Sequence, residues 1–174
     1  YNWDTMEKDN FSWWRKRFGK LEDYFDCFRI DHILGFFRIW EVPLDYVQGL
    51  CGHFNPALPL TPNEIEQYGL GFDEARLTTP HINREFLPEL FGDRTEEVIG
   101  TFLAQSSSRH FVLKPYCDTQ RKVEALFAGK TDEVSLRIKK GLFAIANEVL
   151  FLRDPREPDK FHPRISASQS YLYR

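Results

Sequence analysis

Large apolar side chains recur at three- and four-residue spacings near the start of the chain. This spacing is that of one face of a helix, so the pattern predicts a helix over residues 11–25. The side-chain oxygen of Ser12, or of Asn10 before it, can cap the first turn of such a helix. The apolar face consists of Phe11, Trp14, Phe18, Leu21 and Phe25.

The pattern then changes to a period of two. Phe28 and Ile30 fall on one side of an extended segment, whereas Cys27, Arg29 and Asp31 fall on the other. A strand with both faces specified, directly after a helix, is typical of a parallel α/β arrangement rather than a half-exposed antiparallel sheet. We therefore predict a strand at Phe28–Asp31.

Beyond Pro43 the chain becomes helical in pattern. Glycines and prolines mark a loop over residues 49–60, and Thr61-Pro62-Asn63-Glu64 predicts a helix start with proline in the first turn. The triplet Ser106-Ser107-Ser108 is predicted as a loop between helices, and Asp154–Pro158 as the end of regular structure. Further helices are predicted at residues 82–91, 95–105, 118–127 and 136–152.

Composition excludes several classes of function. The net charge is −3 and no block of like charges occurs, which argues against a nucleic-acid partner. No apolar run approaches the ~20 residues of a membrane span, and no secretory signal is visible. Aromatic residues make up 16% of the chain, which fits an enzyme rich in core aromatics or one that stacks sugar rings.

Cysteines and histidines give no sign of a metal site. The three cysteines, Cys27, Cys51 and Cys117, show no metal-binding spacing and indicate buried, reduced thiols of a cytoplasmic protein. No cofactor or metal is expected. Four histidines are interpreted as surface or capping residues: His53, His81, His110 and His162.

Arg29 and Asp31 are the candidates for chemistry. Two opposite charges on one face of a buried strand have to be paired, since neither can be buried alone. The arginine would keep the carboxylate ionised. Two interpretations stay open on these residues alone: an ordinary buried ion pair, or a carboxylate nucleophile at the carboxyl end of a parallel strand.

A longer motif surrounds this pair. Arg29-Ile30-Asp31-His32, followed by Gly35 and Trp40-Glu41-Val42-Pro43, resembles the nucleophile strand of 4-α-glucanotransferases, glycoside hydrolase family 77. Tyr1-Asn2-Trp3 and Trp13-Trp14-Arg15 resemble the segment that leads into that strand. The sequence from Ile33 to Trp40 resembles the corresponding segment of plant-type cytosolic disproportionating enzymes and their bacterial relatives. It differs from that of common amylomaltases.

The resemblance implies a (β/α)8 barrel enzyme that cleaves an α-1,4-glucosidic bond and passes the glycosyl unit to another sugar. By resemblance, Asp31 is the nucleophile and Arg29 the residue that holds it ionised. His32 matches a substrate-contacting histidine, with a structural hydrogen bond as the alternative. Trp40 and Glu41 are expected to support the site. The implied donor is maltose or a malto-oligosaccharide, and the acceptor a glycogen-like polymer or heteroglycan.

The fold class expected of this chain is mostly α with little strand, from an α/β parent. Residues 1–42 would be an excised helix–strand unit of the barrel, 43–153 a long helical insertion, and 154–174 the return to the barrel. The family's Gly-Glu-Asp-Leu-Gly segment, which supplies the acid/base, and its later His-Asp pair do not occur in the 174 residues. The chain alone is therefore expected to be inactive. Without barrel neighbours, its strand is expected to pair between chains, pack on helices or rearrange.

One alternative function stays open. Residues 43–153 would then be a self-folding helical module for oligomerisation or glucan docking, without catalysis of its own. Such a module would expose a continuous aromatic patch, whereas a spacer would hide its aromatic residues.

Overall fold

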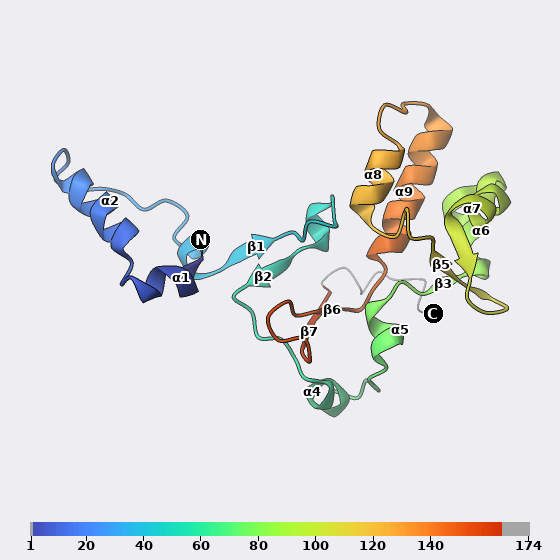
Figure 1. Ribbon diagram of the computed structural model, residues 1–174, viewed down its shortest axis with the longest axis horizontal. Coiled ribbons are helices and arrows are strands. Elements are labelled where there is room, and N and C mark those ends of the chain that lie inside the picture. The colour runs from blue at the N-terminus through green and yellow to red at the C-terminus, as the bar shows by residue number, and fades with distance from the viewer. Residues whose placement is uncertain (1, 165–174) are drawn as a thin grey trace. The chain divides into compact units, whose positions relative to one another are not determined.

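The computed structural model describes residues 2–164 (Figure 1). Tyr1, the first residue of one quoted motif, and residues 165–174, the end of the predicted return segment, lie outside this range. About 47% of the described residues are helical and 13% are in strands, which confirms a mostly helical chain with little strand. Within the described range no helix has the length and apolar character that crossing a membrane requires. The chain divides into two compact units, residues 1–37 and 38–174.

The first unit holds the helices α1 (Trp3–Lys8), α2 (Ser12–Glu22) and α3 (Leu34–Phe37). The helix predicted over 11–25 is therefore present but shorter. Its predicted caps are wrong: Phe11 occupies the N-cap position with φ 54° and provides no side-chain cap. The carboxylate of Asp9 instead accepts the backbone N–H of Ser12 at 3.1 Å, so a residue outside the predicted pair caps the helix.

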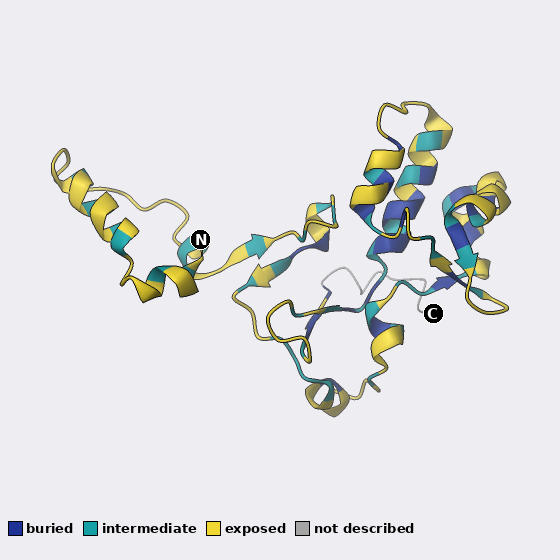
Figure 2. Ribbon diagram, viewed as in Figure 1, coloured by how far each residue is buried: buried dark blue, intermediate teal, exposed yellow. Residues whose placement is uncertain are grey.

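Aromatic rings hold this unit together. Trp14 stacks on Phe18 with ring centroids 5.4 Å apart, and lies 4.9 Å from Phe36 of α3. Trp14 and Phe18 of the predicted apolar face are thus used for packing, whereas Phe11 and Phe25 are 37% and 60% exposed. Nevertheless, no described residue of this unit is buried (Figure 2). The unit has ring-on-ring contacts but no enclosed core.

The strand predicted at Phe28–Asp31 is not formed. The backbone between α2 and α3 contains no strand, and Phe28 stacks on Phe18 of α2 with centroids 4.9 Å apart. Phe28 and Ile30 are 47% and 41% exposed. A strand is held by hydrogen bonds to neighbouring strands, and none of the described residues supplies a neighbour here. Of the alternatives expected for this segment, packing on a helix is found.

The second unit opens with the antiparallel hairpin β1 (Ile39–Glu41) and β2 (His53–Asn55). In its register Glu41 lies opposite His53. The 3₁₀ helix η1 (Gly49–Cys51) leads into β2, and the indole N–H of Trp40 donates to the Gly49 carbonyl at 2.6 Å. A side chain at Gly52 would overlap the Trp40 ring, so only glycine fits there.

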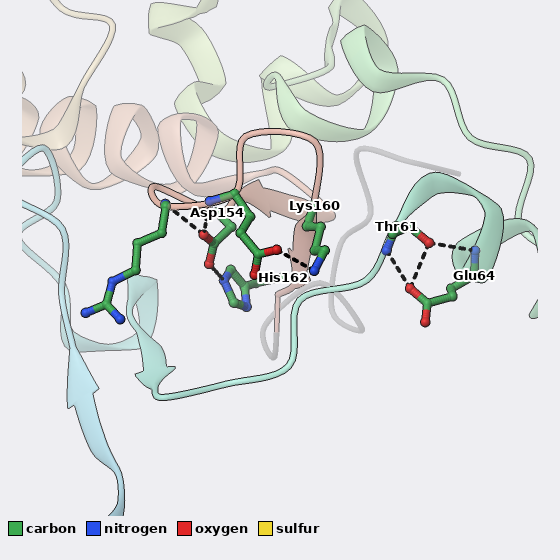
Figure 3. Close-up of polar contacts among 7 residues, drawn as sticks. Thr61, Glu64, Asp154, Lys160 and His162 are labelled. Carbon is green, nitrogen blue, oxygen red and sulfur yellow. Dashed lines mark hydrogen bonds and ion pairs between the residues drawn. The ribbon is translucent and has the colours of Figure 1, made fainter. Parts of the chain in front are cut away.

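Helices account for most of the regular structure in the remainder of this unit. The predicted start at Thr61-Pro62-Asn63-Glu64 is confirmed as a capping box: the Thr61 hydroxyl accepts the Glu64 N–H and the Glu64 carboxylate accepts the Thr61 N–H (Figure 3). The helices are α4 (Pro62–Gln67), α5 (Glu74–Thr78), α6 (Leu87–Phe91), α7 (Thr95–Phe102), α8 (Gln120–Leu126) and α9 (Glu133–Asn147), with 3₁₀ turns η2 (Arg84–Phe86) and η3 (Gly92–Arg94).

Three of the predicted helices are partly strand. Residues 82–91 begin with β3 (Ile82–Asn83), and residues 95–105 end with β4 (Leu103–Gln105). Both strands pair antiparallel with β5 (His110–Leu113), in the order β3-β5-β4. Ser106-Ser107-Ser108 is therefore a turn between strands rather than a loop between helices.

The third helix prediction that is wrong in part concerns residues 136–152. The helix predicted at 136–152 stops at Asn147, and β6 (Phe151–Arg153) follows. Regular structure does not end at Asp154–Pro158 either, because β7 (Phe161–Pro163) pairs antiparallel with β6. The two prolines sit in the hairpin loop, where their missing N–H groups are not needed for the ladder.

Two apolar clusters lie within the second unit (Figure 2). The larger is centred on the helices α6, α7, α8 and α9 and includes Phe91, Val123 and Leu142. The smaller joins α4 and α5 to the β6–β7 hairpin through Ile65, Leu77, Phe151 and Phe161. Of the cysteines predicted to be buried, Cys51 and Cys117 are buried, whereas Cys27 is exposed.

The segment between the two strands of the first hairpin is clamped to α8. The fully buried Gln120 accepts the N–H groups of Val47 and Gln48 at 2.9 and 3.1 Å, and donates to the Phe143 carbonyl of α9 at 3.1 Å. Arg121 donates to the carbonyls of Leu44 and Tyr46. These bonds fix a loop that would otherwise carry unpaired backbone groups.

Candidate functional site

Arg29 and Asp31, the predicted catalytic pair, do interact. Nη2 of Arg29 donates to Oδ1 of Asp31 at 2.8 Å. The expected burial is absent: the two side chains are 87% and 84% exposed. An ion pair so open to water contributes little to stability, since solvent screens it. The ion pair predicted from the i, i+2 spacing of Arg29 and Asp31 is thus present. The buried surroundings predicted for it are not provided by the described residues.

His32 follows with an unusual backbone. Its φ is 52°, in the left-handed region that non-glycine residues rarely adopt. Its carbonyl accepts the Gly35 N–H at 2.9 Å, which closes a tight turn into α3. A Cβ at Gly35 would lie 2.8 Å from Cδ2 of His32. The glycine thereby allows the imidazole of His32 to lie close over the turn.

A second group of titratable side chains lies in the second unit. Oε1 of Glu41 accepts from the Asn55 side-chain amide at 2.8 Å across the β1–β2 hairpin. His53, opposite Glu41, stacks on His162 of β7 with ring centroids 5.1 Å apart. Burial is the main reason that the pKa of His53 is lowered, and the neighbouring His162 adds to it. Nδ1 of His53 is buried without a hydrogen-bond partner among the described residues.

Asp154 holds His162 in place (Figure 3). Oδ2 of Asp154 lies 2.6 Å from Nε2 of His162, and Oδ1 accepts the N–H groups of Arg156 and Glu157. Burial works against ionisation of Asp154, but the bonds from Glu157, His162 and Arg156 outweigh it and lower the pKa of the carboxyl. His162 is only 6% exposed, so its prediction as a surface or capping residue is wrong.

Two cavities open around this group. One of about 170 Å³ is lined by Glu41, Asn55, Asp154 and His162 among others. A larger one of about 460 Å³ has a mostly apolar wall that includes Val42, Tyr46 and Leu152. Glu41, His53, Pro155 and His162 line both cavities. Sequence reasoning missed this group because its members are up to 121 positions apart, from Glu41 to His162.

Neither group is a metal site. Among residues 2–164 no cluster of three or more histidine, cysteine, aspartate or glutamate side chains could hold an ion. A further pair of neighbouring histidines is formed by His81, just before β3, and His110 of β5, with ring centroids 4.4 Å apart and the rings tilted by 46°. Ser107 Oγ lies 3.0 Å from Nδ1 of His110, within the β4–β5 turn.

Comparison with known proteins assigns the chain to a family. Residues 1–142 match the family model of glycoside hydrolase family 77, 4-alpha-glucanotransferase. This range includes Arg29, Asp31 and His32, as well as Glu41 and His53. It ends before Asp154 and His162.

Individual relatives carry the same description. The 4-alpha-glucanotransferase DPE2 of rice, Oryza sativa subsp. japonica, is 38% identical over 175 residues, which is 98% of this chain and 18% of the relative. The chloroplastic/amyloplastic 4-alpha-glucanotransferase of potato, Solanum tuberosum, is 45% identical over 71 residues, 40% of this chain and 12% of the relative. The 4-alpha-glucanotransferase of Chlamydia trachomatis serovar D is 34% identical over 58 residues, 33% of this chain and 10% of the relative.

The chain thus spans less than a fifth of the length of these relatives. No solved structure matches it. The family match covers most of the chain, and the rice relative extends the similarity over almost all of it, as the motif around Asp31 predicts. The chain belongs to the 4-alpha-glucanotransferase family, glycoside hydrolase family 77.

Proposed function

We propose that this chain supplies the nucleophile segment of a retaining 4-α-glucanotransferase. The observation that supports this most is the Arg29–Asp31 bond of 2.8 Å within the part of the chain that matches the family. The guanidinium of Arg29 holds one carboxylate oxygen of Asp31 by a charge-assisted hydrogen bond, which orients the group for attack. In the retaining reaction Asp31 attacks the anomeric carbon while the α-1,4-glucosidic bond breaks and the acid/base carboxyl gives its proton to the departing sugar oxygen, which leaves a covalent glycosyl-enzyme. The acceptor hydroxyl, deprotonated by the same carboxylate, then attacks that carbon and releases Asp31.

Arg29 and His32 have separate roles in this proposal. Arg29 orients one oxygen of Asp31 and leaves the other for attack. His32 contacts the sugar at the cleavage point, and its left-handed backbone beside Gly35 sets the direction of its ring. The acid/base carboxylate would come from residues outside these 174, so the chain alone would not turn over.

The donor is proposed to be maltose or a malto-oligosaccharide and the acceptor a glycogen-like polymer or heteroglycan, in the cytoplasm. Residues 1–42 would form part of a (β/α)8 barrel and carry its nucleophile strand, with 154–174 returning to the barrel. In that setting Phe28 and Ile30, exposed here, would be covered by neighbouring strands.

Replacement of the nucleophile tests the proposal. In the complete enzyme, Asp31→Asn is expected to lower glucose release from maltose plus glycogen by at least about 10³-fold, because an amide cannot form the glycosyl-enzyme. The matched control is Asp26→Asn, an exposed aspartate of the same interhelical segment, which should leave the rate unchanged. Retention of more than a tenth of the rate by Asp31→Asn, with normal circular dichroism, would refute the assignment.

A second candidate function is a binding module without catalysis, formed by residues 43–153. It is favoured by one observation: the second unit has its own buried core, whereas the first unit has none. A separately packed unit can bind a ligand independently of the nucleophile.

A further inference from the structure

The two cavities around Glu41, His53 and His162 belong to one polar groove with an apolar wall. They share these three residues and Pro155, and together they border the β1–β2 and β6–β7 hairpins. The larger, of about 460 Å³, is within the roughly 300–1,000 Å³ that is usual for small-molecule sites.

The polar groups of the groove are held in fixed positions. Asn55 holds Glu41 at 2.8 Å, Asp154 holds His162 at 2.6 Å, and His162 stacks on His53. On the apolar wall, the backbone of Tyr46 is held by Arg121 of α8, which donates to its carbonyl. A site whose groups are already ordered loses less entropy when a ligand binds.

The charges of the groove exclude several classes of ligand. Glu41, Asp154 and Glu157 line the smaller cavity with Arg156, and Arg153 lines the larger one. A phosphate or carboxylate ligand would thus meet three carboxylates against two guanidinium groups. A metal ion finds no suitable cluster among the described residues. A wholly apolar ligand would leave the carboxylate and amide without the partners they have in water.

An uncharged sugar fits what remains. Its hydroxyl groups donate to a carboxylate such as Glu41 and exchange hydrogen bonds with an amide or imidazole. The apolar face of its ring packs on an aromatic or aliphatic wall, here Tyr46, Val42 and Leu152. We propose that this groove is a glucan-binding site in the second unit, separate in its residues from Asp31, and that it holds an α-1,4-linked glucan chain. The linkage rests on the function proposed above.

Histidine NMR tests the groove directly. The sequence has five histidines, so their ring Hε1 signals can be followed in the full chain. Added maltotetraose is expected to shift the signals of His53 and His162. The neighbouring pair of His81, next to β3, and His110, on β5, is an internal control and should not shift. Absence of shifts at His53 and His162, or equal shifts at all four, overturns the proposal.

A matched pair of variants measures the contribution of the carboxylate. Glu41→Gln should raise the Kd for maltotetraose about tenfold, since hydrogen bonds to a charged acceptor are among the strongest. Glu66→Gln, on the exposed face of α4, should leave the Kd unchanged. Equal affinities for both variants overturn the proposal. Unchanged His81 and His110 signals in Glu41→Gln show that the unit has kept its fold.

The readout needs no turnover, so the two proposals fail independently. Shifts at His53 and His162 in a protein whose complete form transfers no glucosyl unit would leave the groove assigned and the catalytic proposal refuted. Transfer by the complete enzyme without these shifts would refute the groove alone. Cellotetraose, the β-1,4 isomer, tests the linkage: binding as tight as that of maltotetraose overturns the assignment to an α-1,4 glucan.

Discussion

The two units of this chain differ in how much of their structure they determine themselves. In the second unit, Phe91, Leu142 and Ile145 are fully buried between helices that the same unit provides. In the first, the aromatic rings of α2 stack on one another, yet no described residue is buried (Figure 2). The segment with the proposed nucleophile thus lies in the unit whose own residues bury it least. Within residues 2–37 no side chain covers this segment well enough to bury any of its residues.

Matched leucines test this difference most strongly. Leu142→Ala removes a fully buried side chain from α9 and is expected to destabilise the second unit by about 2–5 kcal/mol, through lost burial and the cavity left behind. Leu34→Ala, at a side chain that is 68% exposed in α3, should cost less than about 0.5 kcal/mol. Urea denaturation followed by circular dichroism measures both. Similar losses would mean that the two units are stabilised alike.

A pair of glycines gives a smaller effect in the second unit. At Gly141 of α9 an added Cβ would overlap the ring of Phe91, so Gly141→Ala is expected to cost about 1–3 kcal/mol by overpacking. At Gly100 of α7 nothing lies within 4 Å of the added atom. Gly100→Ala should therefore stabilise, by up to about 1 kcal/mol, because alanine favours the helix. The difference in thermal midpoints measures the contact, and stabilisation by both variants would contradict it.

Low pH is expected to lower the stability of the second unit through protonation of His53. Its pKa is lowered, chiefly by burial, so below about pH 6.5 the unfolded chain takes up a proton that the folded chain resists. Stability is then lost as the pH falls from about 6.5 toward the folded pKa. The effect should stay below about 1 kcal/mol, since solvent screens a partly exposed group.

Denaturation at pH 7 and pH 5 measures this loss. His53→Gln is expected to reduce it, whereas His32→Gln, exposed in the first unit, should leave it unchanged. Asp154 acts in a different window: its pKa is lowered, so its contribution is present above about pH 3.9 and is lost only below that value. A pH dependence that survives His53→Gln in full would assign it to other groups.

Two local signals in the sequence predicted local structure correctly, whereas the predicted caps of α2 were wrong. The helix start at Thr61 needs only a hydroxyl and a glutamate three residues apart, and both hydrogen bonds of the capping box are present. The i, i+2 spacing of Arg29 and Asp31 likewise predicted their ion pair. The roles of Asp31, Arg29 and His32 in catalysis stay predictions.

Features that depend on distant residues were not predictable in the same way. The strand at Phe28–Asp31 fails because strands are completed by neighbours, whatever their own periodicity. β6 and β7 were missed because each is three residues long and they are joined by a loop with two prolines. The pairing of His162 with Asp154 follows only once that hairpin is known. An aspartate and a histidine flanking such a loop next to apolar residues were the available signal.

The clamp of Gln120 and Arg121 has a consequence for protein engineering. The helices of the second unit cannot be treated as a detachable cassette, although they pack as a unit of their own. Excision of α8 would strip the acceptor from the Val47 and Gln48 N–H groups and the donor from the Leu44 and Tyr46 carbonyls. A shortened variant must therefore retain α8 and the part of α9 on which it packs, if the β1–β2 hairpin is to stay in place. Deletions are better made in other segments.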